Sequence, residues 1–189
     1  LRERRDDIPL LVRNFVRDNL DPSLVAYVET SNEVWNSAYK VSGQAIREGV
    51  AKGLHPSDKY TAGTKRYAER TGEVMDVWSA VFAGKMNRIV RVAATQNGTY
   101  SIRQILGFRD TAKKIDAVAT APYFGIKLNP GDASNMDRWF ASTVTPKLDL
   151  VLDIAKQAKA EAAKYNLRYI TYEAGQHVTS STDVPMLIA

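Results

Sequence analysis

The sequence predicts an α/β fold of the (β/α)8-barrel type, present as an incomplete barrel. Short β-rich runs alternate with helical patterns along the chain, and the connections are long enough to cross over, so parallel strands are expected. No GxGxxG motif follows the first strand, which disfavours a dinucleotide-binding sheet, and functional groups gather at strand ends, as they do in barrels. Only four strands are recognisable, whereas a closed barrel usually needs about 250 residues. The chain therefore resembles part of a barrel.

Composition indicates one globular domain and excludes several classes of protein. The chain has 189 residues, 44% of them hydrophobic, and a formal charge of +5 carried by scattered basic residues. Scattered charge does not favour nucleic acid binding. The absence of cysteine excludes disulfides and thiolate metal sites. No apolar run is long enough to span a bilayer, and the charged first residues do not form a signal peptide, so we expect no membrane partner. A secreted or periplasmic location and the oligomeric state are left open.

Residues 1–13 are interpreted as an N-terminal extension to a single domain that covers residues 1–189. The segment 1–16 resembles part of the AAA+ ATPase domains of bacterial enhancer-binding regulators. No GxxxxGK[ST] loop accompanies it, so no function is inferred from that likeness. An acidic cap and Pro9 predict a helix that begins near residue 6, and Asp21-Pro22 ends it.

The remaining elements follow from the period of the apolar residues. Four strands are expected at residues 24–29, 88–96, 115–124 and 168–173. Helices are expected at residues 39–52, 64–82, 101–113 and 137–165, the last with a possible break near Pro146. A loop is expected at residues 125–135, and residues 176–189 are interpreted as irregular. Trp78 and Trp139 lie in helical patterns and are expected to pack in the core.

Alternation along the strands predicts which side chains share a face. On the last strand we expect Tyr169, Thr171 and Glu173 to point inward, with Ile170 and Tyr172 under the helices. On the third strand, the inward face is expected to carry alanines and end at an aromatic hydroxyl.

The first two strands suggest a buried ion pair. Glu29 shares a face with Glu33, and Arg91 lies on the neighbouring strand. We therefore expect Glu29 and Arg91 to form a buried structural pair.

Two strand-end glutamates are the principal candidates for catalysis. The run 27–36 places Glu33 beside an amide and an indole, and the run 168–177 delivers Glu173 at its end, 140 positions later. Two carboxylates at the carboxyl edge of one sheet are the minimum for glycoside hydrolysis.

These residues resemble a known clan of enzymes. Asn32-Glu33, Tyr123 and Glu173, with two strands between the glutamates, are similar to the retaining (β/α)8 glycoside hydrolases, which carry Asn-Glu on strand 4 and Glu on strand 7. The phrases at 28–36, 121–125 and 172–177 look like a group of bacterial cellulase-like barrel proteins, and the likeness covers about residues 14 to 178. It implies that strands 4 to 7 are present and strands 1 to 3 and 8 are missing.

The resemblance also implies roles. Glu173 would be the nucleophile and Glu33 the acid/base in retaining cleavage of a β-linked poly- or oligosaccharide. Asn32 would bind the sugar 2-hydroxyl, and Tyr123 would orient Glu173. In a closed barrel of roughly 7.5 Å radius, the two carboxyls would stand roughly 5 to 6 Å apart, within the retaining range.

Further side chains are candidates for substrate binding. Trp35 offers a flat face for stacking on a sugar ring, and Asn36, Gln96 and His177 offer hydroxyl-binding groups at strand ends. The histidines are too isolated for a metal site, and no cofactor is expected. Two other functions stay open: a carbohydrate-binding or scaffold barrel without turnover, and, more distantly, a nucleic-acid-binding module.

Overall fold

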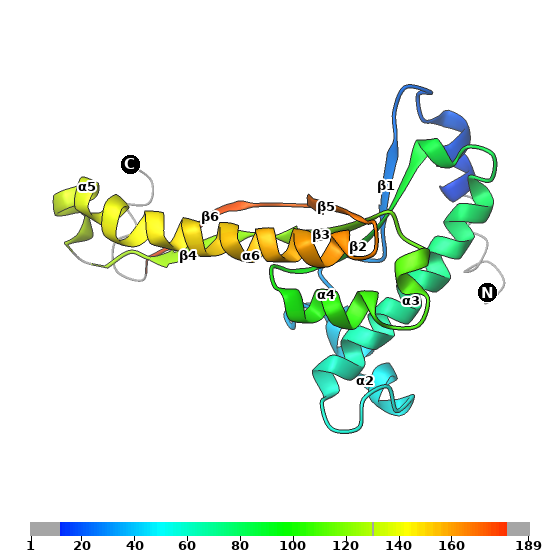
Figure 1. The fold of residues 1–189 in the computed structure, drawn as a ribbon, viewed down its shortest axis with the longest axis horizontal. Helices are drawn as coiled ribbons and strands as arrows, with labels where there is room; N and C mark the ends of the chain where they lie inside the picture. The colour runs from blue at the N-terminus through cyan, green and yellow to red at the C-terminus, as the bar shows by residue number, and fades with distance from the viewer. Residues whose placement is uncertain (1–11, 130, 181–189) are drawn as a thin grey trace.

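The computed structural model describes residues 12–129 and 131–180, and its centre is a four-stranded parallel sheet (Figure 1). The strands lie side by side in chain order: β1 (Ala26–Glu29), β2 (Ile89–Gln96), β3 (Ala117–Ala121) and β5 (Arg168–Thr171). The predicted α/β class with parallel strands is confirmed. Since all four strands run the same way, their carboxyl ends meet at one edge of the sheet.

Helices connect the strands at the expected places. The structure has a helix over residues 12–19, then α2 (Lys40–Ala51), α3 (Lys59–Val81), α4 (Thr99–Leu106) and α6 (Thr145–Ala163). Helix α3 begins five residues earlier than predicted because the Asp58 side chain accepts a hydrogen bond from the N–H of Tyr60 and caps it. The predicted start of the first helix, and most of the proposed extension 1–13, lie outside the described residues.

A second, two-stranded sheet prolongs the first. Strands β4 (Tyr123–Lys127) and β6 (Gly175–Thr179) pair in parallel and continue β3 and β5 into an arm along which α6 lies (Figure 1). The prediction of a loop from residue 125 is therefore wrong for residues 125–127, which belong to β4. The prediction of an irregular segment from residue 176 is wrong for residues 176–179, which belong to β6. These strands are held by an apolar cluster of the arm, which comprises Phe124, Ile126, Leu128, Trp139, Val144 and Val178.

The long C-terminal helical run does not break at Pro146. Helix α5 (Met136–Trp139) passes through a π-helical turn (Phe140–Val144) directly into α6. Pro146 closely follows the π-helical turn, in which the regular helical hydrogen-bond pattern is already interrupted, so the missing N–H of the proline is accommodated there. Trp139 is buried, and Trp78 packs against the main core, as predicted.

The two faces of the sheet carry separate apolar clusters. Helices cover one face, which we call the helix side, and Met75, Phe82, Ile102, Ile105, Val118 and Tyr169 pack there. The opposite face, which we call the inner face, carries Val90, Val92, Ala94, Ala117 and Ala119, with Ile170 and Tyr172 against them. The inward alanines of β3 are confirmed. The faces predicted for β5 are reversed, because Tyr169 lies under the helices and its hydroxyl contacts that of Thr120 at 2.6 Å.

The expected ion pair between Glu29 and Arg91 is absent. Arg91 is paired in register with Val28, on the helix side, whereas Glu29 is paired with Val92, on the inner face. The two charges therefore point to opposite faces. Arg91 binds Asp116 instead, with Nε–Oδ2 at 2.9 Å and Nη2–Oδ1 at 2.7 Å.

Candidate active site

The segment after β1 is a strained loop that presents Glu33. Ser31 (φ 64°) and Glu33 (φ 42°) both adopt left-handed backbone conformations, which cost non-glycine residues about 1 kcal/mol or more. Asn36 holds the turn because its N–H donates to the Glu33 carbonyl and its Nδ2 donates to Glu33 Oε2, both at 2.8 Å. Asn36 thus orients the carboxylate rather than presenting a free amide. Such stored strain is typical of functional sites.

Glu173 follows β5, which is the outer strand of the sheet on the side opposite β1, and it lies near Glu33. Strand β5 ends at Thr171, and residues 172–174 interrupt the ladder before β6 begins. The Glu173 carboxyl lies near enough to the Glu33 carboxyl and to the Tyr123 hydroxyl for both groups to shift its pKa. Two glutamates that are 140 positions apart therefore converge at the carboxyl edge of one sheet.

Electrostatics couple the two carboxyls. Partial desolvation and the neighbouring Glu33 carboxyl raise the pKa of Glu173, whereas the Tyr123 hydroxyl acts in the opposite direction. Within the described residues, neither glutamate forms an ion pair with a lysine or arginine. The neighbouring Glu33 carboxyl therefore favours the protonated form of Glu173.

Glu29 is a third carboxyl at this site, and sequence reasoning assigned it only a structural role. It lies on the inner face at the end of β1, and burial together with the charges of Glu33 and Glu173 raises its pKa to about 7. Glu29 lies four residues before Glu33 at the end of a strand, and this position could have predicted that it lies near Glu33 and Glu173. Glu29 therefore adds to the concentration of acidic groups.

Tyr172 was also missed, because alternation along β5 placed it under the helices. The break after Thr171 lets both Tyr172 and Glu173 reach the inner face. The Trp35 Nε1–H donates to the Tyr172 hydroxyl at 3.1 Å. Burial raises the pKa of Tyr172, and the nearby carboxylates act in the same direction. Tyr172 thus connects Trp35 to the acidic group.

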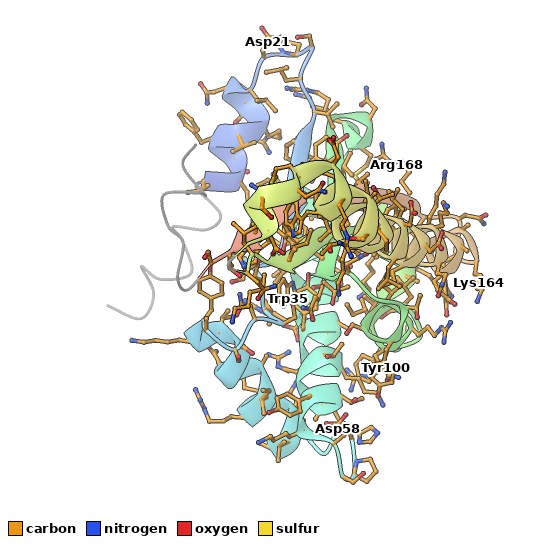
Figure 2. The ribbon with its side chains drawn as sticks, turned by 90° about the vertical axis from the view of Figure 1, so that its left-hand side faces the viewer. Asp21, Trp35, Asp58, Tyr100, Lys164 and Arg168 are labelled. Carbon is orange, nitrogen blue, oxygen red and sulfur yellow. The ribbon has the colours of Figure 1, made fainter. Side chains whose placement is uncertain are left out.

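The other predicted binding residues lie around this group. His177, on β6, is exposed, and its ring centroid is 6.4 Å from that of Tyr123. Asn32 is exposed beside Glu33. Gln96, at the end of β2, borders a cavity together with Trp35 and not the carboxyl pair itself. In Figure 2, Asp21, which precedes β1, and Trp35, which follows it, lie toward opposite ends of that strand.

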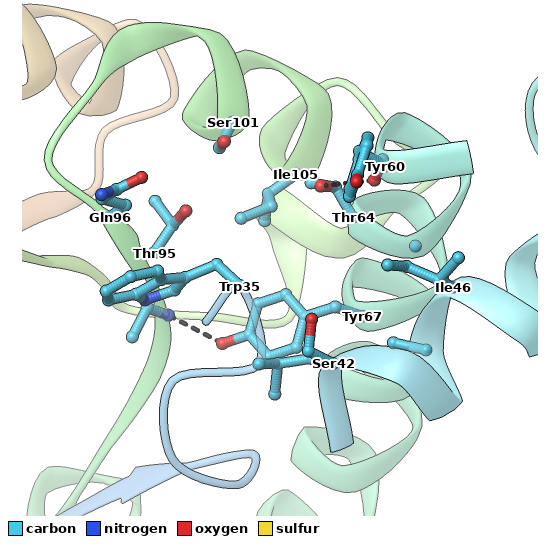
Figure 3. A pocket seen from close by; sticks show the side chains of 14 residues that line it. Trp35, Ser42, Ile46, Tyr60, Thr64, Tyr67, Thr95, Gln96, Ser101 and Ile105 are labelled. Atoms are coloured by element: carbon cyan, nitrogen blue, oxygen red, sulfur yellow. Dashed lines mark hydrogen bonds between the residues drawn. The ribbon is translucent and has the colours of Figure 1, made fainter. Parts of the chain in front are cut away.

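That cavity lies behind Trp35, between the end of β2 and helices α2, α3 and α4, and has a volume of about 160 Å³ (Figure 3). In the part of the chain that the structure describes, no group of histidine and acidic side chains is arranged to hold a metal ion. Among the same residues, no helix has the length and apolarity that a membrane span requires.

The chain was compared with protein-family models, curated proteins and solved structures. The chain matched no protein-family model, no curated protein and no solved structure at a significant level. The class that the fold and site define is an α/β protein with a group of carboxyls at the carboxyl edge of a parallel sheet.

Proposed function

We propose that this chain is the strand 4 to 7 portion of a (β/α)8-barrel glycoside hydrolase that cleaves a β-linked poly- or oligosaccharide with retention. The observation that carries the proposal is the convergence of Glu33 and Glu173 at one sheet edge, with the Tyr123 hydroxyl near Glu173. The resemblance of the residues around them to bacterial cellulase-like barrel proteins supports it. Strands in chain order, each a neighbour of the last, are the arrangement that such a barrel requires.

The mechanism follows from the two carboxyls. Glu173, ionised, attacks the anomeric carbon while Glu33 donates its proton to the leaving oxygen, and a covalent glycosyl-enzyme forms. Glu33 then takes a proton from water, which attacks the anomeric carbon and releases Glu173. When a sugar separates the carboxyls, their mutual repulsion falls. The Tyr123 hydroxyl then favours the ionised form of Glu173.

A second function is supported by one feature of the same site. The pKa of Glu173 is raised by desolvation and by the neighbouring Glu33 carboxyl, which disfavours the ionised form that a nucleophile needs. A barrel that binds carbohydrate without turnover does not need that ionised form. The two functions therefore differ in whether Glu173 forms a covalent bond.

A mechanism-based inhibitor decides between them. We expect an activated 2-deoxy-2-fluoro-β-glycoside to add one sugar mass to the protein, located on Glu173 by peptide mass spectrometry. Glu173→Gln should lose labelling, whereas Glu73→Gln, an exposed helix carboxyl, should keep it. Glu33→Gln should slow poor leaving groups much more than good ones. Sugar binding without any adduct on the parent protein would favour the binding barrel.

A further inference from the structure

The cavity behind Trp35 has a chemical character of its own. Its wall is built from the end of β2, the loop after β1 and three helices (Figure 3). The lining residues are Val34, Trp35, Ser42, Ala45, Ile46, Tyr60, Gly63, Thr64, Tyr67, Ala94, Thr95, Gln96, Ser101 and Ile105. None of these carries a formal charge. An ionic ligand would find no counter-charge in the cavity, so its occupant is expected to be neutral.

Two of the hydroxyl-bearing residues of this wall are buried. Ser42, on α2, is 5% exposed, and Thr95, on β2, is 2% exposed. Neither hydroxyl makes a hydrogen bond to another of the described residues, although both residues border the cavity. A hydroxyl that borders a cavity and has no protein partner can donate a hydrogen bond to a molecule inside the cavity and accept one from it. Figure 3 shows Ser42 and Thr95 at the cavity, the first on a helix and the second on a strand.

The remaining wall is aromatic and aliphatic. Trp35 and Tyr67 present rings, and Ile46 and Ile105 present branched side chains. The Tyr67 hydroxyl already accepts the N–H of Ala94 at 2.8 Å. A mixture of ring faces and separate hydroxyls suits a molecule with apolar C–H faces and a polar edge, which is the character of a sugar ring. A water molecule takes up about 30 Å³, so a cavity of about 160 Å³ is larger than single waters require.

Trp35 joins this cavity to the carboxyl group. Its indole forms one wall, while its Nε1–H is bound to Tyr172 on the side of Glu33 and Glu173. We propose that the cavity is a subsite that holds one uncharged sugar ring of the substrate, next to the carboxyls. This inference rests on the proposed function for the identity of the substrate. It adds a site that the strand-end residues alone do not define.

Binding measured apart from turnover tests the subsite. Isothermal titration of the parent chain and of Glu173→Gln with cellobiose, xylobiose and mannobiose is expected to detect at least one of these sugars. The double variant Ser42→Ala/Thr95→Val keeps the shape of the wall and removes both hydroxyls, so that sugar should bind about tenfold more weakly. Ala45→Leu fills the cavity and should abolish binding. Thr145→Val, exposed at the start of α6, is the matched control and should bind like the parent.

The outcomes separate the subsite from the proposed function. Loss of binding in the cavity variants supports the subsite even if no variant turns over substrate. Equal affinity in the parent and the double variant, or no binding of any of the three sugars, would overturn it and leave water as the occupant. Labelling of Glu173 together with unchanged sugar affinity in Ala45→Leu would keep the hydrolase and reject the subsite. Circular dichroism of each variant checks the fold.

Discussion

Replacing Glu29 by glutamine should make the protein more stable at alkaline pH and leave it nearly unchanged at acid pH. The carboxyl is partly buried on the inner face beside Glu33 and Glu173, and its pKa is raised from 4.5 to about 7. Below pH 4.5 the group is protonated in both the folded and the unfolded chain, so it costs nothing. As the pH rises to about 7 the unfolded chain releases the proton first, and the free energy of unfolding falls. Above pH 7 the full cost is present.

The size of the effect follows from the pKa. A rise from 4.5 to about 7 corresponds to about 3.4 kcal/mol. The side chain keeps some contact with solvent, so screening reduces the effect to about 2 kcal/mol. Glutamine has the same shape and no charge. The variant should therefore exceed the parent in the free energy of unfolding by about 2 kcal/mol at pH 8 and by little at pH 4.5.

Urea unfolding monitored by circular dichroism at the two pH values measures this difference. Asp149→Asn, an exposed carboxyl on α6, serves as the control and should change stability by less than about 0.5 kcal/mol at either pH. The reasoning fails if the gain of Glu29→Gln is the same at pH 4.5 and pH 8, or if the variant is the less stable protein at pH 8.

Three further predictions concern the core, all checked by urea unfolding. Arg91→Met should cost about 3 kcal/mol, because it leaves the partly buried Asp116 carboxylate without its bidentate partner; a loss under 1 kcal/mol would contradict the pairing. Gly49→Ala should destabilise by several kcal/mol, since the added Cβ would lie 2.2 Å from a backbone oxygen of α3. Gly43→Ala on the same helix is the control: its Cβ meets only a flexible arginine, so this variant should be neutral or stabilising. Tyr67→Phe should cost about 1–3 kcal/mol by leaving a backbone N–H of β2 unpaired, and an unchanged midpoint would argue against that hydrogen bond.

Strand order and the convergence of the carboxyls were readable from the chain. Alternating β and helical patterns required crossovers and hence parallel neighbours, and two strands between the glutamates brought the ends of β1 and β5 to one edge. Glu33 and Glu173 were predicted together for that reason. The family resemblance predicted Tyr123 near Glu173, and in the structure the Glu173 carboxylate contributes to the raised pKa of Tyr123.

Other features depend on where strands stop. The interruption at residues 172–174 ends the period-two alternation, so the face of Tyr172 could not be read from its neighbours. Strand β6 contains the polar residues Gln176 and His177, which are typical of a loop in the sequence, and it forms because it pairs with β4. A strand edge stabilises a polar segment through backbone hydrogen bonds, which carry no side-chain signature.

The amino-acid sequence by itself determined the α/β class, the parallel order of the strands and the meeting of two distant glutamates, because periodicity and chain direction are local properties that add up along the polymer. Only the tertiary structure decided the pairing of Arg91 with Asp116, the third carboxyl at Glu29 and the cavity behind Trp35. Each of these depends on register and on contacts between elements far apart in the chain. A shift of one residue in register exchanges the two faces of a strand, so no local pattern fixes such contacts.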